Sequence, residues 1–191
     1  MITHPPNPGA LRGFPRTRFE SGWRLHRREF PPEFYFRGPS RFTPARSTNV
    51  GVFYLTSTMD DALIEAVEPG VVVSSTFFEG RILSELDLSD IEFANLQSRH
   101  SLSFGMSLEI SMSLDYSWGQ EWASALSDVG FGGVAFPSRR IPGATLLAVF
   151  GEEGPATGLE IIRQLPITSD ALQRVGITAV DDWAASGLDP L

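Results

Sequence analysis

The stretch VGVFYLTSTMDDALIEAVEPG, residues 50–70, changes from a strand pattern to a helix pattern within a few residues. Its first six residues are apolar, β-branched or aromatic, which is typical of a buried strand. Ser57 or Thr58 can act as the N-cap of a following helix, the next two aspartates favour its first turn, and Pro69-Gly70 ends it. The stretch therefore predicts a strand that leads directly into a helix.

The helix within this stretch has one apolar face. Leu63, Ala66 and Val67 are spaced i, i+3 and i+4, so they are expected to point toward the core. Glu65 lies on the flank of that face. Its carboxylate is thus near enough to the apolar face to be drawn into a cleft.

The rest of the chain mixes strand and helix patterns without a regular strand–helix–strand rhythm. Strands are predicted at residues 23–27, 81–88, 133–136, 145–150 and 159–165, and helices at 120–128 and within 170–183. Residues 30–49 have the pattern of a long loop, and residues 89–116 carry both helix and strand signals. This mixture predicts an α+β fold in which helices flank a mainly antiparallel sheet.

The length of 191 residues indicates one compact domain. Residues 1–20 are rich in proline, glycine and arginine without a period, and they predict an extended N-terminal arm before a single domain over residues 21–191. Cysteine is absent, which excludes disulfides, zinc fingers, iron–sulfur clusters and cysteine nucleophiles. The three histidines lack metal-ligand spacing, so no metal site is predicted.

No run of 18–20 apolar residues is present, and the first residues lack the basic and apolar regions of a signal peptide. We therefore expect a cytoplasmic protein with no membrane partner.

Charge is distributed unevenly. All fifteen basic residues are arginine, and nine of them precede residue 47, so the first 46 residues carry about +6 and the remainder about −14. The N-terminal arginines alternate with aromatic residues, which favours a folded segment over a nucleic-acid arm. The acidic remainder would repel a nucleic-acid backbone. A compact anion such as a nucleotide pyrophosphate, which arginine binds bidentately, fits this pattern better than direct binding of nucleic acid.

Common catalytic motifs are missing: the sequence has no P-loop, G-x-G-x-x-G, G-x-S-x-G or H-E-x-x-H. The glycine-rich residues 130–133 follow a helix and precede a strand, an order that indicates a turn rather than a phosphate loop. What remains is a set of scattered residues, each of which alone has an ordinary explanation as a surface charge, a core aromatic, a helix face or a turn. The set consists of Arg24, Arg41, Tyr54, Glu65 and Ser138.

Together with their neighbours these residues resemble a known family. The segments are WRLHR at 23–27, RFTP at 41–44, VFYL at 52–55 followed by ALIE at 62–65, and GFGGVAFPS at 130–138. They resemble the RES-domain family, which is named for its Arg, Glu and Ser residues. The resemblance implies an ADP-ribosyltransferase-like fold and an enzyme that degrades NAD⁺ as its substrate, with no cofactor. It also implies the toxin of a type II toxin–antitoxin pair, neutralised by an Xre-type antitoxin whose C-terminal segment blocks the cleft.

The resemblance also assigns site residues. Arg24 and Arg41 match the family's arginines, and Tyr54, Glu65 and Ser138 match its tyrosine, glutamate and serine. Ser117 matches a position that some relatives use in place of Ser138. Two neighbours of the loop arginine depart from the pattern: Ser40 stands where the family often has glycine, and Thr43 where it has asparagine or aspartate.

The chemistry of NAD⁺ cleavage suits these residue types. Loss of nicotinamide leaves an oxocarbenium-like ribosyl centre, which a carboxylate such as Glu65 would stabilise. Arg24 and Arg41 would bind the pyrophosphate, Tyr54 would stack on nicotinamide or ribose, and Ser138 would bond the carboxamide or a ribose hydroxyl. Because nicotinamide is a good leaving group, no general acid is needed.

Several alternatives stay open at this stage. Water and phosphate are both acceptable acceptors, and Ser117 and Ser138 both remain candidates for the functional serine. Two alternative functions fit the same fold: an ADP-ribosyltransferase that modifies a macromolecule, and a catalytically silent nucleotide-binding module. If the gene has no antitoxin gene beside it, the protein is better interpreted as a secreted effector delivered to a competitor. The sequence also leaves open whether the chain forms a homodimer.

Overall fold

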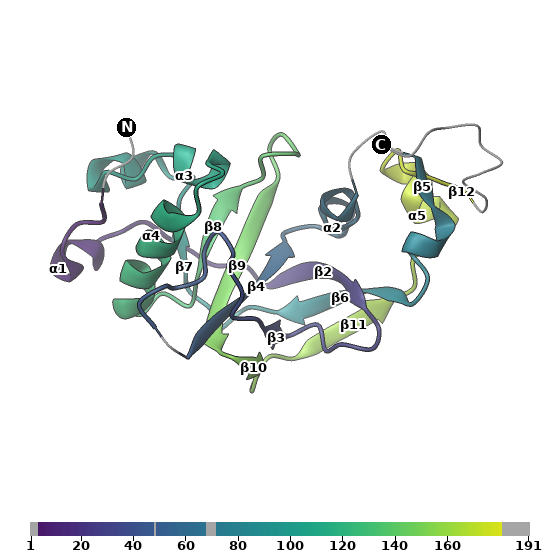
Figure 1. Ribbon diagram of the computed structural model, residues 1–191, viewed down its shortest axis with the longest axis horizontal. Helices are drawn as coiled ribbons and strands as arrows, with labels where there is room; N and C mark the ends of the chain where they lie inside the picture. The colour runs from purple at the N-terminus through teal and green to yellow at the C-terminus, as the bar shows by residue number, and fades with distance from the viewer. Residues whose placement is uncertain (1–3, 48, 68–71, 181–191) are drawn as a thin grey trace.

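The protein is built on one large mixed sheet, as the computed structural model in Figure 1 shows. The structure describes residues 4–47, 49–67 and 72–180. Among the described strands, every neighbouring pair in this sheet is antiparallel except β7 and β8. The prediction of an α+β fold with a mainly antiparallel sheet is confirmed. In spatial order the strands are β1 (Arg16–Thr17), β7 (Phe93–Asn95), β8 (Gly133–Pro137), β9 (Thr145–Glu152), β4 (Val50–Thr56), β2 (Ser21–Arg27), β6 (Arg81–Asp87) and β11 (Ile161–Leu165).

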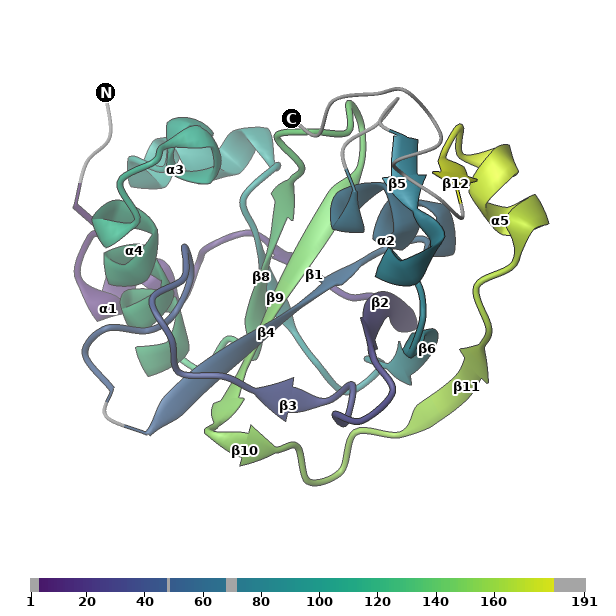
Figure 2. The same cartoon turned by 45° about the vertical axis from the view of Figure 1, so that its right-hand side comes forward.

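The helices form two groups. Figure 2 shows α1, α3 and α4 on the side of β8, and α2 and α5 on the other side near a small parallel pair of strands. In the second group, α2 packs on β2, β4 and β6. The helices are α1 (Pro8–Leu11), α2 (Met59–Ala66), η1 (Ser75–Phe77), η2 (Arg99–Phe104), α3 (Glu109–Met112), α4 (Ser117–Asp128) and α5 (Ser169–Arg174). The small pairs are β12 (Thr178–Val180) with β5 (Val72–Ser74), and β10 (Gly154–Pro155) with β3 (Phe34–Tyr35).

The central strand β4 separates two parts of the core. Its side chains alternate, so Val52 and Tyr54 pack with the cluster around Trp122 of α4, whereas Phe53 and Leu55 belong to the cluster on the other face. Tyr54 is only partly buried, while Val52 is 3% exposed. The alternation therefore leaves Tyr54 as the side chain of β4 that can face a cleft beside α4.

The predicted strand-to-helix block is confirmed as β4 and α2. Thr58, rather than Ser57, is the N-cap, and its hydroxyl accepts a hydrogen bond from the Asp61 N–H at 3.1 Å. Leu63 and Val67 are buried as predicted, but Ala62 is buried with them instead of Ala66. Ala62 belongs to the cluster that includes Trp23 of β2, and this neighbour was not evident from helical spacing. The predicted stop at Pro69-Gly70 lies outside the described residues.

The prediction of an extended arm over residues 1–20 is wrong for part of that segment. Residues 8–11 form α1, whose N-cap Asn7 accepts from the Ala10 N–H at 3.0 Å. Leu11 and Phe14 are fully buried, and the Phe14 ring lies 6.0 Å from that of Trp122. Two apolar side chains in a proline- and glycine-rich segment are enough to anchor it once α4 offers a surface.

Other boundaries moved by a few residues. The helix predicted at 120–128 begins at Ser117, and the last predicted strand begins at Ile161. The predicted helical region 170–183 contains α5 and then β12, with residues 181–183 outside the described part. The ambiguous segment 89–116 contains one strand, β7, and the helices η2 and α3.

His26 is a buried polar residue of β2 with a complete set of partners. Its Nδ1 lies 2.9 Å from the carbonyl of Arg27 and 3.0 Å from that of Phe30, and its Nε2 lies 2.7 Å from Ser84 Oγ. Carbonyls only accept, so Nδ1 carries the proton and Nε2 accepts from the Ser84 hydroxyl. Burial lowers the pKa of His26, the main cause being loss of solvent around its charged form.

We expect this histidine to make folding sensitive to mild acid. A pKa that is lower in the folded than in the unfolded chain means that the unfolded chain binds more protons below about pH 6.5. The free energy of unfolding should therefore fall as the pH drops from 7 to 5, by at most about 1.4 kcal/mol per pH unit from this one group. Urea unfolding at several pH values, for the wild type and His26→Gln, measures the effect. The free energy of unfolding should depend less steeply on pH in the variant than in the wild type. Equal slopes would contradict the lowered pKa of His26.

Candidate active site

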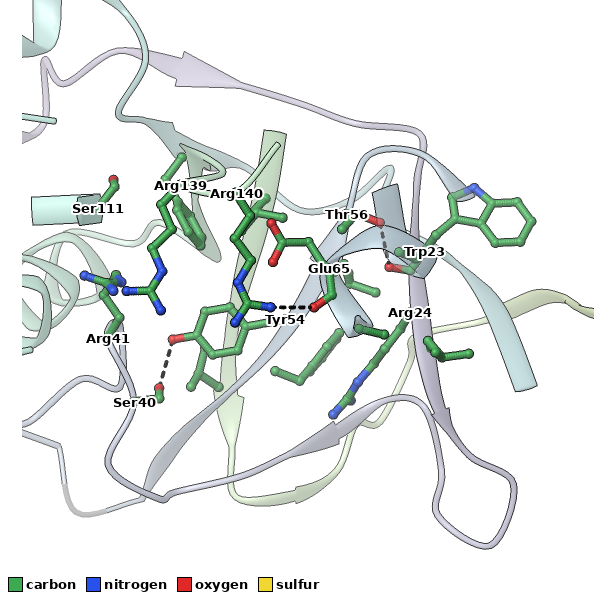
Figure 3. Close-up of a pocket in the computed structure, with 18 of the residues that line it drawn as sticks. Trp23, Arg24, Ser40, Arg41, Tyr54, Thr56, Glu65, Ser111, Arg139 and Arg140 are labelled. Atoms are coloured by element: carbon green, nitrogen blue, oxygen red, sulfur yellow. Dashed lines mark hydrogen bonds between the residues drawn. The ribbon is translucent and has the colours of Figure 1, made fainter. Parts of the chain in front are cut away.

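A cleft of about 660 Å³ opens over β4 and β2, between α2 and the α3–α4 region. This volume is within the usual range for small-molecule sites. Among the described residues that line it are four arginines and a single carboxylate, which gives the cleft a positive charge in a protein of net charge −8. These five residues are Arg24, Arg41, Arg139, Arg140 and Glu65 (Figure 3).

Glu65 is held in place by the turn that follows β8. Ser138 Oγ accepts hydrogen bonds from the backbone N–H groups of Arg140 and Ile141, each at 2.9 Å, and donates its own proton to Glu65 Oε1. Arg140 Nη1 also donates to the backbone carbonyl of Glu65 at 3.3 Å. Glu65 Oε2 has no hydrogen bond within the described part of the chain. One carboxylate oxygen is therefore anchored, and the other is available to a ligand.

The structure places Ser138 next to Glu65. Ser138 is 7% exposed and is not among the described residues that line the cleft. Its hydrogen bonds orient the carboxylate of Glu65.

Ser117, the second candidate serine, does not reach the cleft. It is exposed at the first turn of α4, where its N–H donates to Asp115 Oδ1 at 2.9 Å. Its neighbour Tyr116 lines the cleft instead. Of the two serines, the structure brings only Ser138 to Glu65.

The hydroxyl of Tyr54 ties β4 to the loop before it. The Phe42 N–H donates to Tyr54 Oη at 3.0 Å, and Oη lies 2.9 Å from Ser40 Oγ. Ser40 Oγ lies 2.6 Å from Thr43 Oγ1, which donates to the Gly38 carbonyl at 2.9 Å. Because the Thr43 proton is used there, Ser40 donates to Thr43 and Tyr54 donates to Ser40. Burial raises the pKa of Tyr54, which keeps its hydroxyl protonated for this role.

Ser40 and Thr43 are the two residues at which the loop departs from the family pattern. In this chain they are consecutive members of the hydrogen-bond chain from Tyr54. The departure therefore has a structural use, because hydroxyl groups at both positions fix the loop that carries Arg41.

Tyr54→Phe is expected to lower kcat/KM for the substrate of this cleft about tenfold and the free energy of unfolding by about 1 kcal/mol. The change leaves the ring in place but removes one acceptor and one donor from the loop. Steady-state kinetics and urea unfolding measure the two effects. Tyr35→Phe is the control, since Tyr35 is buried without a hydroxyl hydrogen bond among the described residues. Equal behaviour of the two variants would contradict the role of Tyr54.

Arg41 is held at one end of the cleft by backbone carbonyls. Its Nη1 donates to the Ile110 carbonyl at 3.0 Å and to that of Ser113, and its guanidinium lies 4.9 Å from the ring centre of Tyr116. Burial lowers the pKa of Arg41; Tyr116 opposes this shift and the positive charge of Arg139 adds to it. The side chain is thus pre-positioned next to another cation.

Arg24 occupies the other end. Its Nη1 donates to the Pro32 carbonyl at 2.5 Å, and its guanidinium lies 5.6 Å from the ring centre of Phe53. Burial lowers its pKa, and the charge of Glu33 acts in the opposite direction. Figure 3 shows Tyr54 and Glu65 between Arg24 and Arg41, so the two predicted arginines flank the cleft rather than form a pair.

Residues that sequence reasoning missed complete the lining. Arg139 and Arg140 follow Ser138 directly, and Tyr116 and Ser40 come from the loops before α4 and β4. A signal for the two arginines was present, because adjacent arginines are unusual in the acidic part of this chain and stand at the end of a strand that carries a candidate site residue.

Within residues 4–47, 49–67 and 72–180, no group of three histidine, aspartate or glutamate side chains is placed to hold a metal ion. In the same part of the chain, no helix has both the length and the apolar character needed to cross a bilayer.

The sequence matches the RES domain over residues 21–170, and the chain belongs to this family. Its fold is also similar to that of a chain in the crystal structure of the M. tuberculosis MbcT–MbcA toxin–antitoxin complex. The two share 16% sequence identity with a TM-score of 0.69, over 88% of this chain and 95% of that one. A comparison with curated protein sequences returned no match.

Proposed function

We propose that this protein is the toxin of a toxin–antitoxin pair and that it degrades NAD⁺ by breaking the bond between nicotinamide and ribose. Membership of the RES family and the similarity of fold to a chain of a toxin–antitoxin complex support the first part. The single observation that carries the second is the carboxylate of Glu65, oriented by Ser138 in a cleft whose other charged groups, among the described residues, are arginines.

The charges of NAD⁺ match this cleft. The dinucleotide has an anionic diphosphate, for which guanidinium groups are suited, and a cationic nicotinamide ring joined to ribose. Glu65 supplies the negative charge needed beside the ribose, and arginines at both ends supply positive charge for the phosphates. The aromatic ring of Tyr54, between these groups, offers a surface for nicotinamide or ribose.

The reaction breaks the C1′–N1 bond of the nicotinamide ribose, and the bonding electron pair leaves with neutral nicotinamide. The ribosyl carbon becomes oxocarbenium-like, and the carboxylate of Glu65 stabilises its positive charge. An oxygen of water or of phosphate then bonds to C1′. With water the products are ADP-ribose, nicotinamide and a proton; with phosphate they are ADP-ribose carrying a 1″-phosphate and nicotinamide.

The test is to incubate the purified protein with NAD⁺ in buffers with and without phosphate. Release of free nicotinamide supports the proposal, and the mass of the second product identifies the acceptor. Absence of nicotinamide in both buffers would refute NAD⁺ cleavage. Transfer of ADP-ribose to added protein or nucleic acid, without free ADP-ribose, would favour the transferase alternative.

The antitoxin would be an Xre-type protein that inserts a carboxylate-bearing segment toward the arginines of the cleft. Expression of the toxin alone should arrest bacterial growth and deplete NAD⁺. Co-expression of the adjacent reading frame should restore both. Growth arrest that persists in the presence of every neighbouring gene product would contradict the pair.

A further inference from the structure

One end of the cleft brings two cations together. Arg41 lies on the loop before β4 and Arg139 on the turn after β8, and Figure 3 shows their guanidinium groups side by side. The positive charge of Arg139 contributes to the lowered pKa of Arg41, in agreement with this proximity. Segments almost one hundred residues apart in sequence thus place like charges next to each other.

Among the described residues, no carboxylate lies close enough to compensate these charges. Six arginines elsewhere form ion pairs with aspartate or glutamate, namely Arg16, Arg18, Arg27, Arg46, Arg163 and Arg174. None of those six lines the cleft. Neither Arg41 nor Arg139 has a carboxylate within 4.0 Å in the described part of the protein. In an acidic protein, an uncompensated pair of cations is a place for an anion from outside.

The two side chains differ in how they are held. The carbonyls of Ile110 and Ser113 fix Arg41 through Nη1. Arg139 is exposed and has no hydrogen bond to another described residue, so all its donors are available. A fixed guanidinium beside a free one can bind a tetrahedral oxyanion through several donors at once.

We propose that Arg139 and Arg41 together form a phosphate-binding subsite at the end of the cleft away from Arg24. This inference rests on the proposed function for the identity of the ligand, which is a phosphate group. The group is either part of the substrate's diphosphate or the inorganic phosphate that acts as acceptor. Arg139 is then a binding residue of the site.

The experiment measures binding rather than turnover. Inorganic phosphate and ADP-ribose are titrated separately, by calorimetry in a buffer otherwise free of phosphate, into the wild type and Arg139→Gln. Charge-assisted hydrogen bonds are lost in the variant, so we expect at least one ligand to bind about tenfold or more weakly. Arg99→Gln is the control, because Arg99 is exposed and does not line the cleft. This variant should bind both ligands as the wild type does.

The pattern of loss identifies the source of the phosphate group. Weaker binding of ADP-ribose assigns the subsite to the diphosphate, whereas weaker binding of inorganic phosphate alone assigns it to the acceptor. Unchanged binding of both ligands in Arg139→Gln overturns the proposal, as does a wild type that binds neither or an equal loss in Arg99→Gln. If the wild type releases no nicotinamide but Arg139→Gln still loses binding, the proposed function fails and the subsite stands.

Discussion

Glu65→Gln is expected to lower the rate of NAD⁺ cleavage about a thousandfold while the protein stays folded. Glutamine has nearly the same size, and its side-chain oxygen can still accept the hydrogen bond from Ser138. The variant loses the negative charge beside the developing ribosyl cation. Two unit charges about 4 Å apart at an effective dielectric constant of 20 interact by about 4 kcal/mol, which corresponds to roughly three powers of ten in rate.

The measurement is single-turnover release of nicotinamide with the enzyme in saturating excess over NAD⁺, together with the melting temperature. Glu79→Gln is the matched control, because Glu79 is an exposed carboxylate that does not line the cleft. A Glu65→Gln rate within tenfold of the wild type would show that the carboxylate does not stabilise the transition state.

Gly119→Ala is expected to lower kcat/KM about a hundredfold by moving Arg41. Gly119 lies in the first turn of α4, and a Cβ atom there would overlap the Arg41 carbonyl oxygen and come within 3.2 Å of Arg41 Cγ. The carbonyl belongs to the backbone, so the loop must shift. Displacement of a substrate-binding group by about 1 Å can cost two powers of ten in rate.

Stability distinguishes this effect from simple unfolding. Alanine is a better helix former than glycine by about 1 kcal/mol, which offsets part of the steric cost. The expected outcome is therefore a large loss of activity with a small change in the free energy of unfolding. Ser127→Ala, near the other end of α4, is the control. Activity of Gly119→Ala within threefold of the wild type would contradict the close contact.

Local patterns were sufficient for the elements that carry the site. The run from residue 50 and the cap at Ser57 or Thr58 predicted β4 and α2, and hence placed Glu65 on the helix that follows β4. These signals are local because strand alternation and helix capping depend on neighbours within a few residues. The resemblance then connected Glu65 with Arg24, Arg41, Tyr54 and Ser138 across the chain.

What local patterns missed depended on partners distant in sequence. Leu11 and Phe14 are buried only because α4 lies beside them, and a segment rich in proline and glycine gave no sign of that surface. Nor did local patterns show that the Ser138 hydroxyl is hydrogen-bonded to two backbone N–H groups and to Glu65.

The amino-acid order was thus enough to establish the class of fold and the chemical identity of the charged groups, since these follow from periodicity and residue type. The family followed from the resemblance of whole segments. Tertiary structure decided which charges are neighbours. It separated Arg24 from Arg41, placed Arg139 beside Arg41 and turned the Ser138 proton toward the carboxylate. The reason is physical: electrostatic interaction and hydrogen bonding depend on distance and direction in space, and sheet pairing sets both for residues far apart in the chain.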